Sequence, residues 1–172
     1  MRAKRGKSMD GENTMSEEFD IRDQFEHYTH VGIAVRDMDR YVKRMTEAFG
    51  YKVANYGQTP DSPDKRYNGE YEDFAFKLAF IYRGDQMLEL LEPIRGRNVI
   101  SEYLEKCGEG LHHFNYNVHH YDEVVAHMKE QGYNMIMEGT SFRHPGHRWC
   151  YFDTMDDFGY DIELFELYEG EE

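Results

Sequence analysis

The sequence predicts an α+β fold in which two tandem modules, each ordered strand, helix and three strands, form one curved mixed sheet. The first observation behind this prediction is an internal repeat. An apolar run that opens on His30 is followed by an amphipathic stretch and a Gly-Tyr pair, and the same order returns from His113. The second observation is that each half later places a carboxylate inside an apolar run, at Glu89 and at Glu163. Such self-similarity indicates a duplicated fold whose equivalent residues meet at a shared centre.

The first module is expected at about 25–97. Within 38–49 the apolar residues fall on one helical face, and Asp37 or Asp39 can cap the start of that helix. Gly50 provides a natural C-terminal stop. The strands expected in this module are 28–36, 51–56, 74–82 and 86–92, the last of them ending at Pro93.

The second module is expected at about 108–168, after a short connecting helix over 99–106. Its own helix is expected over 121–131, where apolar residues again recur at helical spacing. The strands expected in this module are 113–118, 134–138, 148–153 and 160–168.

Three further segments stand outside this repeat. Residues 1–24 are polar and aperiodic, which is typical of a disordered leader. Residues 57–72 are charged and rich in turn formers, so they are expected to form a long mobile loop, either a solvated insertion or a lid over a pocket. Residues 169–172 form an acidic tail.

The composition excludes several classes of partner. The chain has 20 basic and 34 acidic residues, a net charge of −14, so nucleic acid and anionic membranes would be repelled. No apolar run approaches the roughly 20 residues of a membrane span, and the basic N-terminus lacks the apolar region of a signal peptide. Two cysteines, Cys107 and Cys150, make a disulfide framework unexpected, so the protein is expected to be cytoplasmic.

The repeated histidine and glutamate predict a metal site. One imidazole and one carboxylate from each half, at His30, Glu89, His113 and Glu163, supply the four donors that a pseudo-symmetric centre needs. These donor types suit Co, Ni, Mn, Zn or Fe(II), and their intermediate hardness does not select one of them. Such a site keeps open positions for water or for a chelating substrate.

Strand alternation indicates which of the neighbouring histidines and glutamates are metal ligands. Successive strand residues face opposite sides, so only one of His112 and His113 should bind the ion, and His113 matches His30 in its context. The same rule separates Glu163 from Glu166. A basic group in the loop before the last strands is either solvated or an anchor for an anionic part of the substrate; it comprises Arg143, His144, His147 and Arg148.

The motifs around these residues resemble the vicinal oxygen chelate superfamily, which includes glyoxalase I, methylmalonyl-CoA epimerases and extradiol dioxygenases. His30–Val35 is similar to the first ligand strand of the superfamily, and 159–164 to the last. The runs 87–93 and 101–113 most resemble the methylmalonyl-CoA epimerase and glyoxalase I-like branch. The His-Pro-Lys run usual in such epimerases is absent here, where 152–158 stands instead, and loop 57–72 is longer than usual.

The resemblance implies a metal-dependent isomerase or epimerase that removes a proton next to a carbonyl through an enediolate. Glu163 is the first candidate for the base and Glu89 the second. The substrate would be a small carbonyl compound, with an acyl-CoA among the candidates, and the protein is expected to be a homodimer. The alternatives are a glyoxalase I-like lyase, an Fe(II) extradiol dioxygenase that would need Glu89 to point away, and a non-catalytic binding protein on the same fold.

Overall fold

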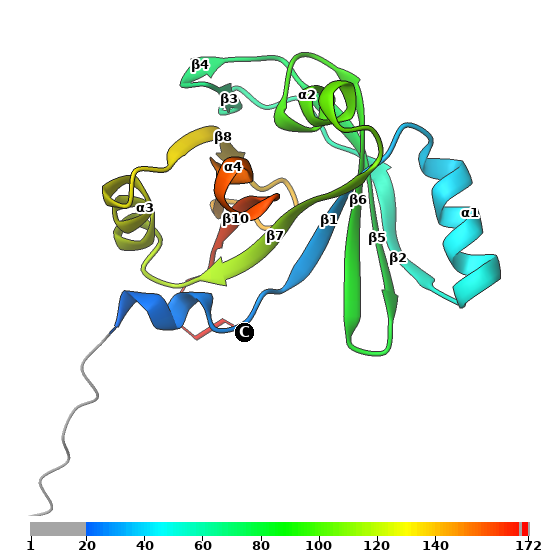
Figure 1. Ribbon diagram of the computed structural model, residues 1–172, viewed down its shortest axis with the longest axis horizontal. Helices are drawn as coiled ribbons and strands as arrows, with labels where there is room; N and C mark the ends of the chain where they lie inside the picture. The colour runs from blue at the N-terminus through cyan, green and yellow to red at the C-terminus, as the bar shows by residue number, and fades with distance from the viewer. Residues whose placement is uncertain (1–19, 169, 172) are drawn as a thin grey trace, which may run out of the picture.

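The repeated order of elements predicted from the sequence is present in the structure. The computed structural model describes residues 20–168 and 170–171, and its strands form one ten-stranded curled sheet (Figure 1). The first half comprises β1 (His30–Ala34), α1 (Met38–Phe49), β2 (Lys52–Gln58), β5 (Ala75–Arg83) and β6 (Gln86–Arg95). The second half comprises β7 (Gly110–Val118), α3 (Tyr121–Glu130), β8 (Asn134–Thr140), β9 (Arg148–Asp153) and β10 (Asp161–Glu166).

The pairing of strands repeats with the sequence. The order in the sheet is β2-β5-β6-β1-β7-β10-β9-β8-β3-β4, and the two halves join where β1 runs antiparallel to β7. In each half the first strand lies parallel to the last one, as β1 does to β6 and β7 to β10. The fold class predicted from the repeat is therefore confirmed, and the first and last strands of both halves meet at its centre.

Local sequence signals set the helix ends. The Asp37 side chain accepts a hydrogen bond from the backbone N–H of Arg40 at 2.9 Å, and Gly50 ends α1 in the left-handed conformation. The connecting helix α2 (Val99–Lys106) begins with a capping box, in which Asn98 and Ser101 each bond the other's backbone. The short α4 (Met155–Phe158) lies in the turn before β10.

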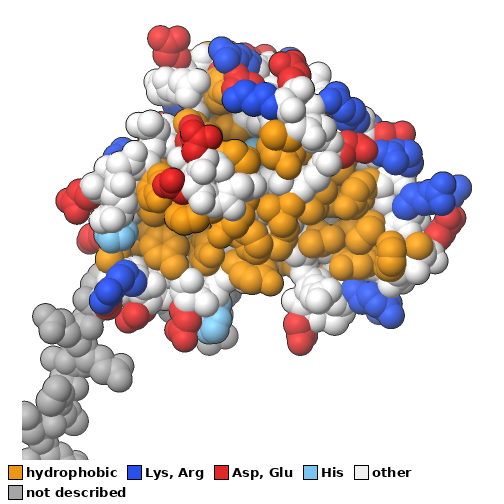
Figure 2. Space-filling view, in the orientation of Figure 1, with side chains coloured by type: hydrophobic (Ala, Val, Ile, Leu, Met, Phe, Trp, Pro, Cys, Tyr) orange, Lys and Arg blue, Asp and Glu red, His pale blue; other side chains and the backbone are white. Residues whose placement is uncertain are grey.

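Helices cover the outer face of each half of the sheet. Apolar residues of α1 pack on β5 and β6, and those of α3 pack on β9 and β10 together with the 3₁₀ helix η1 (Ile21–Phe25). A third cluster joins α2 to both halves through Ile100, Leu91 and Tyr151. Figure 2 shows apolar side chains gathered over the strands between α3 and α1. No helix among the described residues is long and apolar enough to cross a membrane.

The expected loop 57–72 contains strands that the sequence analysis did not predict. Positions 57 and 58 belong to β2, and β3 (Arg66–Tyr67) and β4 (Glu70–Tyr71) form a hairpin. Its turn is Asn68-Gly69 with φ of 50° and 81°, the Asn-Gly pair that a two-residue hairpin favours. β3 pairs with β8, so a segment of the first half extends the sheet of the second.

Two further expectations are corrected. Pro93 does not end β6, which continues to Arg95, because an irregularity in the pairing with β5 accommodates the missing N–H. The disordered leader does not extend to position 24, because η1 packs Ile21 and Phe25 against the second half. Residues 1–19 and two of the four tail residues, 169 and 172, lie outside the described residues.

Candidate metal centre

The four central strands bring the predicted donors to one level of the sheet. The register partners are Gly32 with Glu89, Gly32 with His113, Asn115 with His30, and Asn115 with Glu163. Positions 32 and 115 each stand two residues after a predicted histidine ligand, and each lies between a histidine and a glutamate of its neighbouring strands. The two halves thus present the same pattern to one shared centre.

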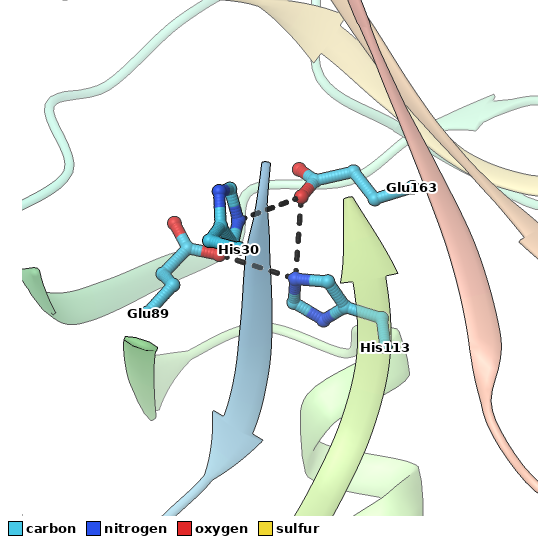
Figure 3. A group of neighbouring side chains, drawn as sticks. All are labelled: His30, Glu89, His113 and Glu163. Carbon is cyan, nitrogen blue, oxygen red and sulfur yellow. Dashed lines mark ion pairs between the residues drawn. The ribbon is translucent and has the colours of Figure 1, made fainter. Parts of the chain in front are cut away.

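The four donors form a ring of alternating imidazole and carboxylate groups (Figure 3). Nε2 of His30 lies 3.4 Å from Oε2 of Glu89 and 3.4 Å from Oε2 of Glu163. Nε2 of His113 lies 3.3 Å and 3.2 Å from the same two oxygens. All four atoms lie within 4.8 Å of one another, and all four side chains are buried. The structure therefore brings together every residue of the predicted set.

Three of the four donor atoms have no hydrogen-bond partner among the described residues. Nε2 of His30, Oε2 of Glu89 and Nε2 of His113 are buried and make no hydrogen bond to any residue in the described part of the chain. Leaving such groups unsatisfied is costly. Two donors that share one ion through bonds of about 2.1 Å lie roughly 3 to 3.5 Å apart, which agrees with the separations in the ring. The residues present therefore fit one divalent transition-metal ion.

Burial and charge act in opposite directions on the histidines. Burial favours neutral imidazole, but the contacts with Glu163 and Glu89 outweigh it and raise the pKa of His30 to about 9. Burial is likewise outweighed at His113, whose pKa the same carboxylates raise. The histidines in turn lower the pKa of both glutamates against the effect of burial. Without a metal ion the two carboxylates therefore favour the protonated form of His30 at neutral pH.

Metal binding is expected to become tighter as the pH rises. Because an ion must displace the His30 proton, the apparent affinity for Zn²⁺ should rise by about tenfold per pH unit and level off above pH 9. In the metal-free protein, folding stability instead decreases as the pH rises. The raised pKa contributes stability that is complete below the ordinary value of 6.5 and is lost as the pH rises through about 9. Competition titrations with a chelator between pH 6.5 and 9.5 measure the first effect, and an affinity that is constant from pH 7 to 9 would contradict it.

The two halves differ at positions 32 and 115. Nδ2 of Asn115 donates a hydrogen bond to Oε2 of Glu163 at 2.9 Å, whereas Gly32 has no side chain to offer Glu89. A Cβ atom built on Gly32 would lie 1.8 Å from Cε1 of His113, so only glycine leaves room for that ring. Neither residue is among those predicted from the sequence. The available signal was their place two residues after each histidine, which puts them on the same face of the strand.

His112 does not follow the alternation expected of it. The pairing of β1 with β7 matches Gly32 to His113 and the next residue of β1 to Leu111, so His112 is an extra residue in β7. Such a bulge redirects a side chain. The rings of His112 and His113 both contact Tyr151, with centroid separations of 6.0 and 4.9 Å. His112 nevertheless stands outside the ring of four donors, as the choice of His113 required.

A cavity of about 310 Å³ lies over the cluster. Its apolar lining includes the rings of Phe74, Phe76, Phe80, Trp149, Tyr151 and Phe165, and the carboxylates that line it are Glu89 and Glu163 of the cluster. Thr59, Pro60, Ser62 and Lys65 line it as well, so the long loop forms one wall. Whether this loop moves as a lid stays a prediction.

The predicted basic group divides between two places. Arg143 and His144 line the cavity, and the Arg143 guanidinium lies 4.8 Å from the centroid of the Phe80 ring. Arg148 instead pairs with Glu166 at 2.7 Å, and His147 is buried with its Nδ1 2.8 Å from the backbone oxygen of Glu166. Glu166 therefore pairs with Arg148, whereas Glu163 lies in the ring of donors, as strand alternation predicts.

The sequence from 29 to 151 matches the family described as the glyoxalase/bleomycin resistance protein/dioxygenase superfamily. The chain belongs to this superfamily. A relative from Bacillus subtilis (strain 168), described as the uncharacterized protein YqjC, is 26% identical over 95 residues, which cover 55% of this chain and 68% of that protein.

Several solved structures share the fold. A hypothetical protein, BH1468 from Bacillus halodurans C-125, superposes with a TM-score of 0.64 at 26% identity, covering 85% of this chain and 97% of that one. Methylmalonyl-CoA epimerase from Mycobacterium tuberculosis superposes with a TM-score of 0.60 at 21% identity, covering 81% of this chain and 86% of that one. A Streptomyces coelicolor methylmalonyl-CoA epimerase in complex with 2-nitronate-propionyl-CoA superposes with a TM-score of 0.59 at 22% identity, covering 81% of this chain and 95% of that one. The epimerases support the fold.

Proposed function

We propose that this superfamily member is a metal-dependent isomerase or epimerase that moves a proton next to a carbonyl group. The observation that carries the proposal is that both carboxylates lining the cavity belong to the four-donor ring. A substrate carbonyl that reaches the ring therefore also reaches a base. The ion, when bound, supplies positive charge that stabilises the enediolate oxygen as the proton leaves.

Glu163 is the first candidate for the base. Its Oε2 keeps the hydrogen bond from Asn115, so the carboxylate stays positioned when other contacts loosen. Glu89 has no such partner among the described residues and is the second candidate. In either case the carboxylate removes the proton from the carbon next to the carbonyl. The product forms when a proton returns to the opposite face of that carbon, for an epimerase, or to the neighbouring carbon, for an isomerase.

The cavity favours a substrate with an apolar body and an anionic group. Its aromatic walls suit the first, and Lys65 and Arg143 suit the second. Lys65 is buried, its ammonium donates to the carbonyl oxygens of Pro60 and Phe74 at 2.7 Å each, and it pairs with no described carboxylate. An acyl-CoA thioester is the first substrate class to test because methylmalonyl-CoA epimerases are among the structural neighbours.

A glyoxalase I-like lyase is the second candidate. The ring contains two histidines and two carboxylates, a donor set that fits proton removal from a hemithioacetal equally well. The Fe(II) dioxygenase alternative required Glu89 to point away, whereas its Oε2 lies in the ring. Cytoplasmic location and a homodimer remain part of the proposal, the latter supported by the apolar surface of Figure 2.

Exchange of substrate hydrogen with deuterium oxide tests the proposal. The metal-loaded protein should catalyse exchange at the carbon next to the carbonyl of methylmalonyl-CoA or of a glutathione hemithioacetal. Glu163→Gln should slow it by about 100-fold to 10,000-fold while keeping a bound ion, because the amide preserves the shape but cannot take the proton. Glu166→Gln, on the same strand but paired with Arg148, is the control.

Three outcomes separate the assignments. Wild-type exchange in Glu163→Gln together with its loss in Glu89→Gln would transfer the role of base to Glu89. Wild-type exchange in both variants would contradict a carboxylate base. An absence of exchange with both substrates, in a protein that holds its metal, would contradict the proposed reaction.

A further inference from the structure

We propose that His112, with Asp161 behind it, hydrogen-bonds His113 and so fixes which nitrogen of His113 faces the metal site. This inference rests on the proposed metal centre and adds two positioning residues to it. Neither residue belongs to the ring of four donors, and neither lines the cavity.

The arrangement begins at the rear nitrogen of His113. Its Nε2 faces Glu89 and Glu163, so Nδ1 points away from them, and Nδ1 lies 3.1 Å from Nδ1 of His112. Both rings are essentially inaccessible to solvent, with exposures of 0% and 1%. One of two nitrogens in such contact must donate and the other must accept.

The metal site decides the direction. Nε2 of His113 can offer its lone pair to an ion only if the ring proton is on Nδ1. His113 therefore donates and His112 accepts through Nδ1. The proton of a neutral His112 must then be on its Nε2, which faces Oδ2 of Asp161 at 3.5 Å. The His112 ring also hydrogen-bonds the backbone of Val99. The backbone N–H of Thr154 holds the same carboxyl group in place through Oδ1, at 3.3 Å.

The bulge in β7 explains how the arrangement is built. In a regular strand the side chain next to His113 would point to the opposite face of the sheet. The extra residue at position 112 turns that ring alongside His113 instead, where Tyr103 packs against it with a centroid separation of 5.1 Å. Asp161 is the register partner of His113 on β10, so its carboxyl group is at the right level of the sheet.

The arrangement serves only one histidine of the ring. Among the described residues, the ring of His30 packs edge-on against Phe80 at a centroid separation of 5.4 Å and has no second histidine behind it. Partners of this kind typically contribute 10-fold to 100-fold to metal affinity. His113 is thus the ligand whose ring orientation is fixed by a neighbouring histidine.

Metal affinity of three full-length proteins tests the inference: the wild type, His112→Leu and His112→Asn. Leucine fills the space but cannot accept a hydrogen bond, so the affinity for Co²⁺ or Zn²⁺ should fall by about 10-fold to 100-fold. Asparagine places an amide oxygen near the position of Nδ1 and should restore the affinity to within about threefold of the wild type. Unchanged affinity in His112→Leu, or equal losses in two folded variants, would overturn the inference.

A second measurement covers the case in which the variants do not fold. Nuclear magnetic resonance of histidine-labelled wild-type protein reports which ring nitrogen carries the proton, without metal or substrate. We expect a proton on Nε2 and none on Nδ1 of His112, and a proton on Nδ1 of His113. A proton on Nδ1 of His112 would overturn the inference, whereas failure of the wild type to bind any ion would instead contradict the proposed metal centre.

Discussion

Replacing His113 by alanine is expected to abolish metal binding and, with it, any activity. The imidazole is fully buried, and its Nε2 contacts both carboxylates of the ring at 3.2 and 3.3 Å. Removing it leaves Glu89 and Glu163 next to each other with only His30 to offset their repulsion. We expect affinity for Co²⁺ or Zn²⁺ to fall by more than about 100-fold, beyond the effect of losing a supporting partner. Isothermal titration with either ion measures this.

Its control is His27→Ala, because the His27 side chain is 87% exposed and should leave metal binding unchanged. Circular dichroism of both variants separates loss of the site from loss of the fold. Metal content in folded His113→Ala equal to that of the wild type would remove His113 from the site.

Replacing Gly32 by alanine is expected to damage the same site without removing any donor atom. The new Cβ would lie 1.8 Å from Cε1 and 2.2 Å from both nitrogens of His113, so the ring must leave its position. The neighbouring strands of a closely packed sheet cannot yield that far without strain. Metal affinity should fall by about 100-fold, as a titration with Co²⁺ would measure.

Gly57→Ala is a matched control. Gly57 also lies in a strand, and a Cβ there would meet no atom within 4 Å. The control therefore adds the same methyl group to a strand where it meets no other atom. If Gly32→Ala bound metal as tightly as Gly57→Ala, the position of the His113 ring in the cluster would be wrong.

The repeat in the sequence was enough to predict the fold class and the four residues of the ring. Helical spacing and capping residues are local signals, which is why α1 begins and ends where Asp37 and Gly50 predict. The ring followed from symmetry, because one histidine and one glutamate per half can meet only if the halves pack around a common axis. Their function as metal ligands stays a prediction that the geometry supports.

Features that depend on distant parts of the chain could not be predicted in this way. β3 pairs with β8, a strand about 70 residues later in the chain. β3 has only two residues, which are too few to give a periodic pattern. The bulge at His112 follows from the register of β1 against β7, which no single strand encodes. The contact between Gly32 and His113 arises from the same pairing.

Metal analysis of the purified protein, before and after chelation, tests the central claim most directly, with His30→Ala prepared in parallel. We expect about one divalent transition-metal ion per wild-type chain, removed by the chelator, restored by adding Co, Ni, Mn, Zn or Fe(II), and lost in the variant. A wild-type protein that contains no such ion and takes up none of the five would contradict the metal centre and the catalytic function proposed from it.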